Sequence, residues 1–176
     1  MVAADNHHNL PNALRLWTFG PPPLASGPVI YQDPTWASWS MHHVSFANAR
    51  SAPLGQQYAC GSGASRINGP RNNEVVCVRL DGSLTTLVVA PVMTDLDTAG
   101  GGSGDYAKEP KGNLDPTGEF FLWTSNMMGG RLDAFIARVP SQLLVTPPAD
   151  ITAPTVAVTA PAQGATVFGI VPLSAT

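Results

Sequence analysis

The stretch that most constrains the fold is residues 110–140, which read PKGNLDPTGEFFLWTSNMMGGRLDAFIARVP. An Asp-Pro-Thr-Gly turn at 115–118 leads into an aromatic and aliphatic run at 119–124. A Gly-rich loop around Gly129 and Gly130 separates this run from a second apolar run at 132–139. Apolar runs that are bounded by Gly, Pro and Asn are typical of paired β-strands. The stretch therefore predicts two strands joined by a loop.

The composition extends this expectation to the whole chain. The 176 residues include 17 Gly and 17 Pro, and 44% are hydrophobic while only 12% are charged. Such frequent punctuation predicts many short strands joined by turns, and an all-β fold. A net charge of -3 offers no basic surface for nucleic acid. No apolar run reaches the length of about 18 residues that a membrane-spanning helix needs, so we expect no membrane span.

The pattern of residues 110–140 recurs earlier in the chain, at residues 42–89. Both stretches contain a turn with Gly, a strand with an aromatic residue, a Gly- and Asn-containing loop, and an apolar strand that ends in Arg and an aliphatic residue. We interpret them as two imperfect copies of one supersecondary module. The chain then divides into an irregular segment at 1–40, the two copies within 41–140, a Pro-rich linker at 141–154 and alternating runs at 155–176.

Cys60 and Cys77 each lie in an apparent strand and enclose a loop rich in Gly, Ser and Asn. If the two strands pair in antiparallel fashion, the sulfurs can face each other. A disulfide closing a loop of this size contributes about 3 kcal/mol in the chain-entropy description. The alternative is a pair of buried free thiols that act as small apolar groups.

Two parts of the chain resemble known bacterial families. Residues 113–126, followed by Asp133-Ala134-Phe135-Ile136, resemble the blade motif of TolB-like and WD-repeat-like β-propellers, although Asp-Pro-Thr-Gly stands where those families have Ser-Pro-Asp-Gly. The tail APTVAVTAPAQGATVFGIVPLSAT resembles the first strands of a bacterial immunoglobulin-like domain.

These resemblances imply a partial β-propeller of about two four-stranded antiparallel blades at 41–140, with 1–40 irregular or part of a blade. They also imply incomplete immunoglobulin-like sandwich strands at 155–176. The remaining blades and strands would belong to a longer parent chain, and a fragment can lack its export signal.

Candidate metal ligands are the histidines His42 and His43 and the acidic residues Asp95, Asp97 and Asp105. Neutral imidazole is a common metal ligand, but neighbouring strand residues point to opposite faces, so at most one of the two histidines faces a shared site. The three Asp residues flank a Gly-rich loop and supply the oxygen ligands that Ca²⁺ prefers. The alternatives are structural histidines and a solvated loop, in which case no cofactor is bound.

Three aromatic residues, Trp36, Trp39 and Tyr106, are candidates for stacking against a ligand such as a sugar. The alternative is that aromatic residues at such positions form the core between sheets. We expect the charged residues Lys108 and Lys111, which lie near Glu109 in the sequence, to be solvated.

The sequence thus favours an extracellular, periplasmic or cell-surface scaffold for binding or display, with no catalytic residues assigned. Its expected partners are a carbohydrate or protein ligand and the adjacent blades and immunoglobulin-like domain of the parent chain. The alternative is a secreted propeller enzyme that processes carbohydrate or peptide at a histidine-based site in the channel. A meeting of His42, His43 and the acidic loop around one cavity would favour the enzyme.

Overall fold

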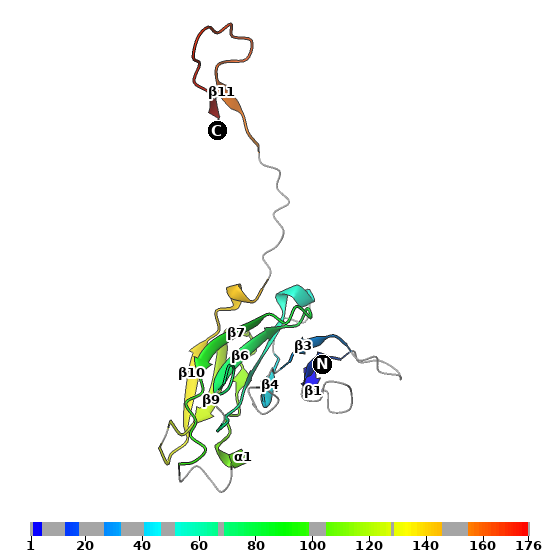
Figure 1. Ribbon diagram of the computed structural model, residues 1–176, viewed down its shortest axis with the longest axis vertical. Coiled ribbons are helices and arrows are strands. Elements are labelled where there is room, and N and C mark those ends of the chain that lie inside the picture. The colour runs from blue at the N-terminus through cyan, green and yellow to red at the C-terminus, as the bar shows by residue number, and fades with distance from the viewer. Residues whose placement is uncertain are drawn as a thin grey trace.

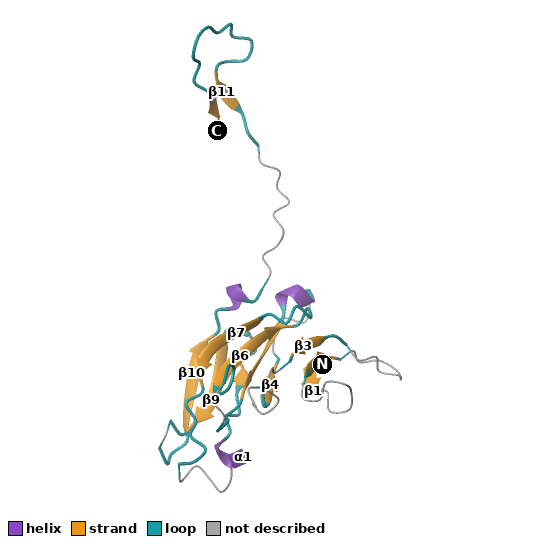
Figure 2. Ribbon diagram, viewed as in Figure 1, coloured by secondary structure: helices purple, strands orange, loops and turns teal. Residues whose placement is uncertain are grey.

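A computed structural model describes residues 2–4, 13–17, 27–32, 41–46, 52–66, 69–98, 105–127, 129–145 and 155–175. In this part of the chain the regular structure is almost entirely antiparallel β-sheet (Figure 2). The helical exceptions are single turns, namely η1 (Leu54–Gln56), α1 (Asp105–Lys108) and η2 (Ser141–Leu143). None of the described helices is long and apolar enough to cross a membrane. The prediction of an all-β fold is confirmed.

The described strands from β1 to β10 form three successive sheets, and in each of them the order of the strands follows the order of the chain. The first sheet contains β1 (Val2–Ala4), β2 (Leu14–Leu16) and β3 (Val29–Tyr31). The central sheet contains β4 (His43–Ser45), β5 (Tyr58–Ser62), β6 (Glu74–Arg79) and β7 (Thr86–Pro91). The third sheet contains β8 (Asn113–Leu114), β9 (Phe120–Ser125) and β10 (Asp133–Arg138).

The central sheet lies between the other two (Figure 1). One of its faces packs on the third sheet, through a cluster that includes Cys77 and Trp123. Its opposite face packs on the first sheet, through a cluster that includes Val76 and Ile30. Because neither face meets water, β5 and β6 are buried along almost their whole length and do not alternate between apolar and polar residues.

The hairpins β5–β6 and β9–β10 have the same arrangement at their open ends, away from the connecting loops. Tyr58 pairs with Arg79 at the end of the first hairpin, and Phe120 pairs with Arg138 at the end of the second. Beyond each Arg, an aliphatic residue donates its backbone N–H to the residue that precedes the first strand. The two bonds are Leu80 N to Gln57 O, 3.2 Å, and Val139 N to Glu119 O, 2.8 Å. The sequence similarity between the two stretches thus corresponds to a shared backbone arrangement.

The disulfide prediction is confirmed, because Cys60 and Cys77 are direct partners in the β5–β6 register and are bonded to each other. Both residues are fully buried in the cluster between the central and third sheets. The alternative of two free thiols is therefore wrong.

The turn at 115–118 joins β8 to β9, as its sequence predicts. Gly118 donates its N–H to the Asp115 carbonyl at 3.0 Å and adopts a φ of 80°, a conformation that Gly reaches without steric cost. The Asp115 carboxylate also accepts the Phe120 N–H at 2.9 Å. These bonds fix where β9 begins.

The architecture differs from the expected one in the third sheet, which has three described strands where four were expected. The segment 1–40, expected to be irregular or part of a blade, supplies the described strands of the first sheet. The described strands form open sheets that close into neither a barrel nor a propeller.

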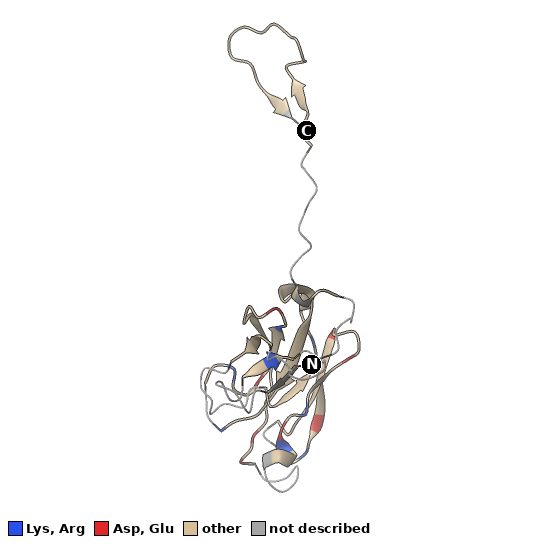
Figure 3. Cartoon of the chain, turned by 90° about the vertical axis from the view of Figure 1, so that its right-hand side faces the viewer, with Lys and Arg blue, Asp and Glu red and all other residues tan. Residues whose placement is uncertain are grey.

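Residues 155–175 form a two-stranded hairpin, β11 (Val158–Ala160) with β12 (Ser174–Ala175), that contains no charged residue (Figure 3). Its apolar side chains are exposed, among them Phe168 and Ile170. The long run at 166–175 forms a strand only at its end. Among the described strands, this hairpin pairs with no third strand. A two-stranded hairpin by itself gains little from burial, which limits its regular structure.

Candidate functional site

A short segment, residues 105–112, runs beside the end of the central sheet and is held by buried polar contacts; we call it the strap. The Lys108 ammonium donates to the Leu96 carbonyl at 2.7 Å, and the Glu109 carboxylate accepts the Ala64 N–H at 2.9 Å. Lys108 is only 8% exposed and Glu109 only 6%. Charged groups become buried at tolerable cost only when they have such partners. The expectation that Lys108 is solvated is therefore wrong.

Ser62 fixes the other end of the strap. Its hydroxyl donates to the Pro110 carbonyl at 3.2 Å and accepts the Gly112 N–H at 3.1 Å. A Cβ atom at Gly112 would overlap the ring of Phe121 and crowd the Ser62 hydroxyl. The strap thus approaches the sheet so closely that only Gly fits at this position.

Five residues, His42, His43, Tyr106, Glu109 and Lys111, gather where β4 meets the strap; we call them the histidine cluster. His42 Nδ1 lies 3.7 Å from the Glu109 carboxylate, and its ring centroid lies 5.0 Å from that of His43. The Tyr106 ring lies 6.5 Å from the His42 ring and 5.9 Å from the His43 ring, between centroids. The Lys111 Nζ lies 4.6 Å from the centroid of the same Tyr106 ring, within the range of a cation–π interaction.

The surroundings of His43 disfavour its protonated form. Burial lowers the pKa of His43, and Coulombic interactions with His42 and Lys111 lower it further. The His43 Nε2 atom is buried and has no hydrogen-bond partner among the described residues. Tyr106, in contrast, is 65% exposed, so the cluster joins an accessible aromatic ring to groups that can donate hydrogen bonds.

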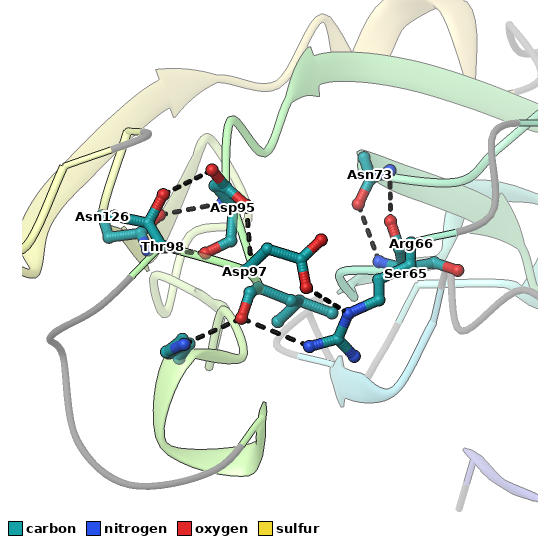
Figure 4. A network of polar contacts seen from close by, with 9 residues as sticks. Ser65, Arg66, Asn73, Asp95, Asp97, Thr98 and Asn126 are labelled. Carbon is teal, nitrogen blue, oxygen red and sulfur yellow. Dashed lines mark hydrogen bonds and ion pairs between the residues drawn. The ribbon is translucent and has the colours of Figure 1, made fainter.

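The polar groups of the acidic loop at 95–98 form hydrogen bonds and an ion pair within the protein (Figure 4). The Asp95 carboxylate accepts the Asp97 N–H at 2.8 Å and the Thr98 hydroxyl. Asn126 brackets the Asp95 backbone, because its side chain accepts the Asp95 N–H at 2.9 Å and donates to the Asp95 carbonyl at 2.7 Å. The Asp97 carboxylate forms an ion pair with Arg66 at 2.6 Å. Both carboxylates are thus engaged by donors of the chain itself.

The hydrogen bond from the Thr98 hydroxyl, followed by the one from the Asp97 N–H, lowers the pKa of Asp95. Asp95 therefore stays ionised in mildly acidic solution. Its ionised carboxylate stabilises the loop by accepting hydrogen bonds from Asp97 and Thr98.

The residues predicted as metal ligands fall into two separate sets of contacts. The histidines contact Tyr106 and Glu109, whereas Asp95 and Asp97 contact the acidic loop and Arg66. Asp105 begins α1, and its side chain lies outside the described positions. Across the described ranges, no three His, Cys, Asp or Glu side chains lie close enough to hold a metal ion. The divalent-metal site stays a prediction.

Of the predicted stacking residues, Trp36 and Trp39 lie outside the described residues, and Tyr106 is exposed in the histidine cluster. Another aromatic residue, Trp123, belongs to the core, where it stacks on Phe135 and donates its indole N–H to the Val92 carbonyl at 3.2 Å. Sequence reasoning missed the role of Glu109. Its backbone partner, Ala64, is 45 residues away, and no local pattern distinguishes such a carboxylate from a solvated one.

Comparison of this chain with protein-family models, with curated proteins and with solved structures finds no match.

Proposed function

We propose that this chain is part of a β-propeller-like stack of sheets that serves as a binding scaffold outside the cell. The packing of one antiparallel meander between two others supports the proposal, because blades of a propeller pack in this way. The Cys60–Cys77 disulfide supports an oxidising compartment, namely the extracellular space, the periplasm or the cell surface. In this proposal a longer bacterial parent chain supplies further blades, and residues 155–175 begin its immunoglobulin-like domain.

The ligand site of this scaffold is the histidine cluster, and the observation that carries this assignment is the exposed Tyr106 ring on an anchored strap. Buried hydrogen bonds of the Lys108 and Glu109 side chains attach the strap to the neighbouring backbone. The Tyr106 ring is therefore carried by a fixed backbone. An accessible aromatic face beside imidazole and ammonium donors suits a ligand with both apolar ring faces and oxygen acceptors. Carbohydrates combine these two features.

The test is a binding assay with defined polysaccharides. Native gels that contain dextran, a neutral polymer, or alginate, an anionic one, would measure how far each polymer retards the protein. We expect retardation by at least one polymer, and we expect Tyr106→Ala to weaken it about tenfold, the equivalent of about 1.4 kcal/mol. Phe168→Ala is the matched control, since it removes an aromatic ring that is 88% exposed on the C-terminal hairpin.

Two outcomes would contradict this assignment. The first is a protein that neither polymer retards. The second is a Tyr106→Ala variant that binds as tightly as the wild type. Circular dichroism of each variant checks that the fold is intact.

The contact between His42 and Glu109 favours a second candidate function, an enzyme that cleaves carbohydrate. A buried carboxylate 3.7 Å from an imidazole can orient that ring as a general base. In this case the wild type would release reducing ends from the same polymers, and His42→Ala and Glu109→Gln would each abolish the release. Binding without any release of reducing ends would leave the scaffold as the better assignment.

A further inference from the structure

A cleft of about 200 Å³ lies where the first sheet meets the central sheet, and it shares no lining residue with the histidine cluster. Its walls come from the end of β3, the turn before β6 and the chain that leads into β7; the lining residues are Tyr31, Gln32, Pro70, Arg71, Leu84 and Thr86. Sites for drug-sized ligands are larger, at roughly 300–1,000 Å³. The cleft therefore suits a ligand about as large as one amino acid.

Arg71 is the one charged residue in the lining of this cleft. Its Nη1 atom lies 3.6 Å from Glu74 Oε2, which is an ion pair longer than a hydrogen bond. Among the described residues, no hydrogen bond engages the guanidinium, and the side chain is 37% exposed. A guanidinium binds a carboxylate through two parallel hydrogen bonds. Arg71 therefore provides an accessible site for an anionic group.

Two of the residues that line the cleft have an unusual backbone conformation. Arg71 has a φ of 70° and Leu84 has a φ of 59°, in the left-handed region that residues other than Gly and Asn rarely adopt. Leu84 is also 49% exposed, so burial in the core does not offset this strain. Strained backbone of this kind is concentrated at functional sites, ligand-binding sites included. Its occurrence on two walls of one cleft indicates that the cleft binds a ligand.

We propose that the cleft binds a monocarboxylate that carries an amide and an apolar side chain. This is the chemistry of an N-acylated amino acid and of the last residue of a peptide. The carboxylate pairs with Arg71, and the apolar side chain packs on Pro70 and Leu84. The Gln32 amide and the Thr86 hydroxyl, which also line the cleft, supply hydrogen-bonding groups for the amide of the ligand.

Glu74 limits the negative charge that the ligand can carry. Its carboxylate lies beside the Arg71 guanidinium and offsets part of the positive charge. A phosphate dianion would meet about twice the repulsion from Glu74 that a monocarboxylate meets. The lining contains no second Lys or Arg that would compensate for this repulsion. The site is therefore suited to a single carboxylate.

An NMR titration of isotope-labelled protein with N-acetyl-L-leucine tests the proposal. A ligand with about a dozen non-hydrogen atoms should bind with a Kd of about 2 mM. We expect saturable shifts of the backbone amide signals of Arg71 and Leu84. N-acetyl-L-leucinamide, which has the same shape without the charge, and inorganic phosphate should each bind at least about tenfold more weakly.

Two variants and a matched control separate the contributions of the two walls. Arg71→Gln should weaken the binding of N-acetyl-L-leucine about tenfold, to the level of the uncharged amide. Arg131→Gln removes an Arg whose side chain is 84% exposed beside β10, and it should bind as the wild type does. Leu84→Gly should weaken binding about fivefold through the loss of apolar contact. It should not lower the melting temperature, because Gly reaches the left-handed region without steric cost.

Four results would overturn the proposal. The absence of saturable shifts at Arg71 and Leu84 up to about 20 mM, ten times the expected Kd, excludes the site. Equal binding of N-acetyl-L-leucine and its amide would show that the guanidinium does not select a carboxylate. Phosphate that binds as tightly as N-acetyl-L-leucine would exclude the proposed class of ligand. Unchanged binding by Leu84→Gly would show that the ligand does not pack on this wall.

A short peptide distinguishes the two sources of such a carboxylate. If acetyl-Gly-Gly-Leu binds more tightly than N-acetyl-L-leucine, the ligand is the end of a peptide. If it binds no more tightly, the ligand is the free N-acylated amino acid.

Discussion

The cross-link between Cys60 and Cys77 makes a prediction whose magnitude follows from the structure. The two residues are 17 positions apart, and a bond that closes such a loop stabilises the fold by about 3 kcal/mol through the lost entropy of the unfolded chain. Reduction leaves both sulfur atoms in place in the core, so it removes the cross-link without creating a cavity. We therefore expect the reduced wild type to lose about 3 kcal/mol of unfolding free energy.

Urea unfolding followed by circular dichroism measures this loss. With a dependence on urea of about 2 kcal/mol per M, the midpoint should fall by about 1.5 M when a reductant is present. The double variant Cys60→Ala/Cys77→Ala should fall further under either condition, because truncation also removes buried atoms beside Trp123. Reductant should leave its midpoint unchanged, which makes it the control for direct effects of the reductant.

One result would refute this reasoning. If oxidised and reduced wild type unfold at the same urea concentration, the cross-link does not constrain the unfolded chain as we infer.

Two further predictions concern the strap and the β8–β9 turn. Gly112→Ala should cost about 2–3 kcal/mol, because its methyl group would overlap the ring of Phe121, and urea unfolding measures the loss. Hydrogen bonds to Asp115, first that of the Thr117 hydroxyl and then that of the Phe120 N–H, lower its pKa in the folded state. The ionised carboxylate therefore stabilises the fold above about pH 4, the ordinary pKa of aspartate, and this contribution is lost as the pH falls through the lowered value. The melting temperature of the wild type should accordingly fall more steeply below pH 4 than that of Asp115→Asn.

Each of these predictions has a control or an opposing outcome. Gly69→Ala should be nearly neutral, since its added methyl group would meet only the end of the Asn72 side chain, at 3.3 Å. An equally small effect at Gly112 would show that the strap can move away from the sheet. Parallel pH profiles of the wild type and Asp115→Asn would show that the carboxylate contributes nothing to the turn.

Local features of the sequence were sufficient to predict much of the framework. The turn at 115–118, the strands on either side of the 129–130 loop and the pairing of the two cysteines all depend on turn chemistry and on short apolar runs. These signals extend over a few residues, so they survive in the sequence. The outline of the repeat could be read for the same reason, since each copy carries its own turn and its own pair of strands.

The candidate site depended on contacts that no local pattern encodes. The strap is held by Ala64 and Ser62, which are 45 and 48 residues away from the groups they bind, and only the folded chain brings them to Glu109 and Pro110. For the same reason, the sequence grouped the histidines with the acidic loop, whereas the folded chain places them beside Glu109.

The strands of the 110–140 stretch separate what the sequence determines, which is the face on which a residue lies, from what the tertiary structure determines, which is whether that face is buried. Alternation along each strand determined that Phe120 and Leu122 would share one face of β9. The observed register then sets Leu122 opposite Ile136, as it sets Cys60 opposite Cys77 in the central sheet. Whether such a face is buried depends on the presence of a neighbouring sheet. Within the described part of the chain, the central sheet has a neighbouring sheet on each side and the third sheet has one on its inner side only. Equivalent residues are therefore buried in one copy and exposed in the other.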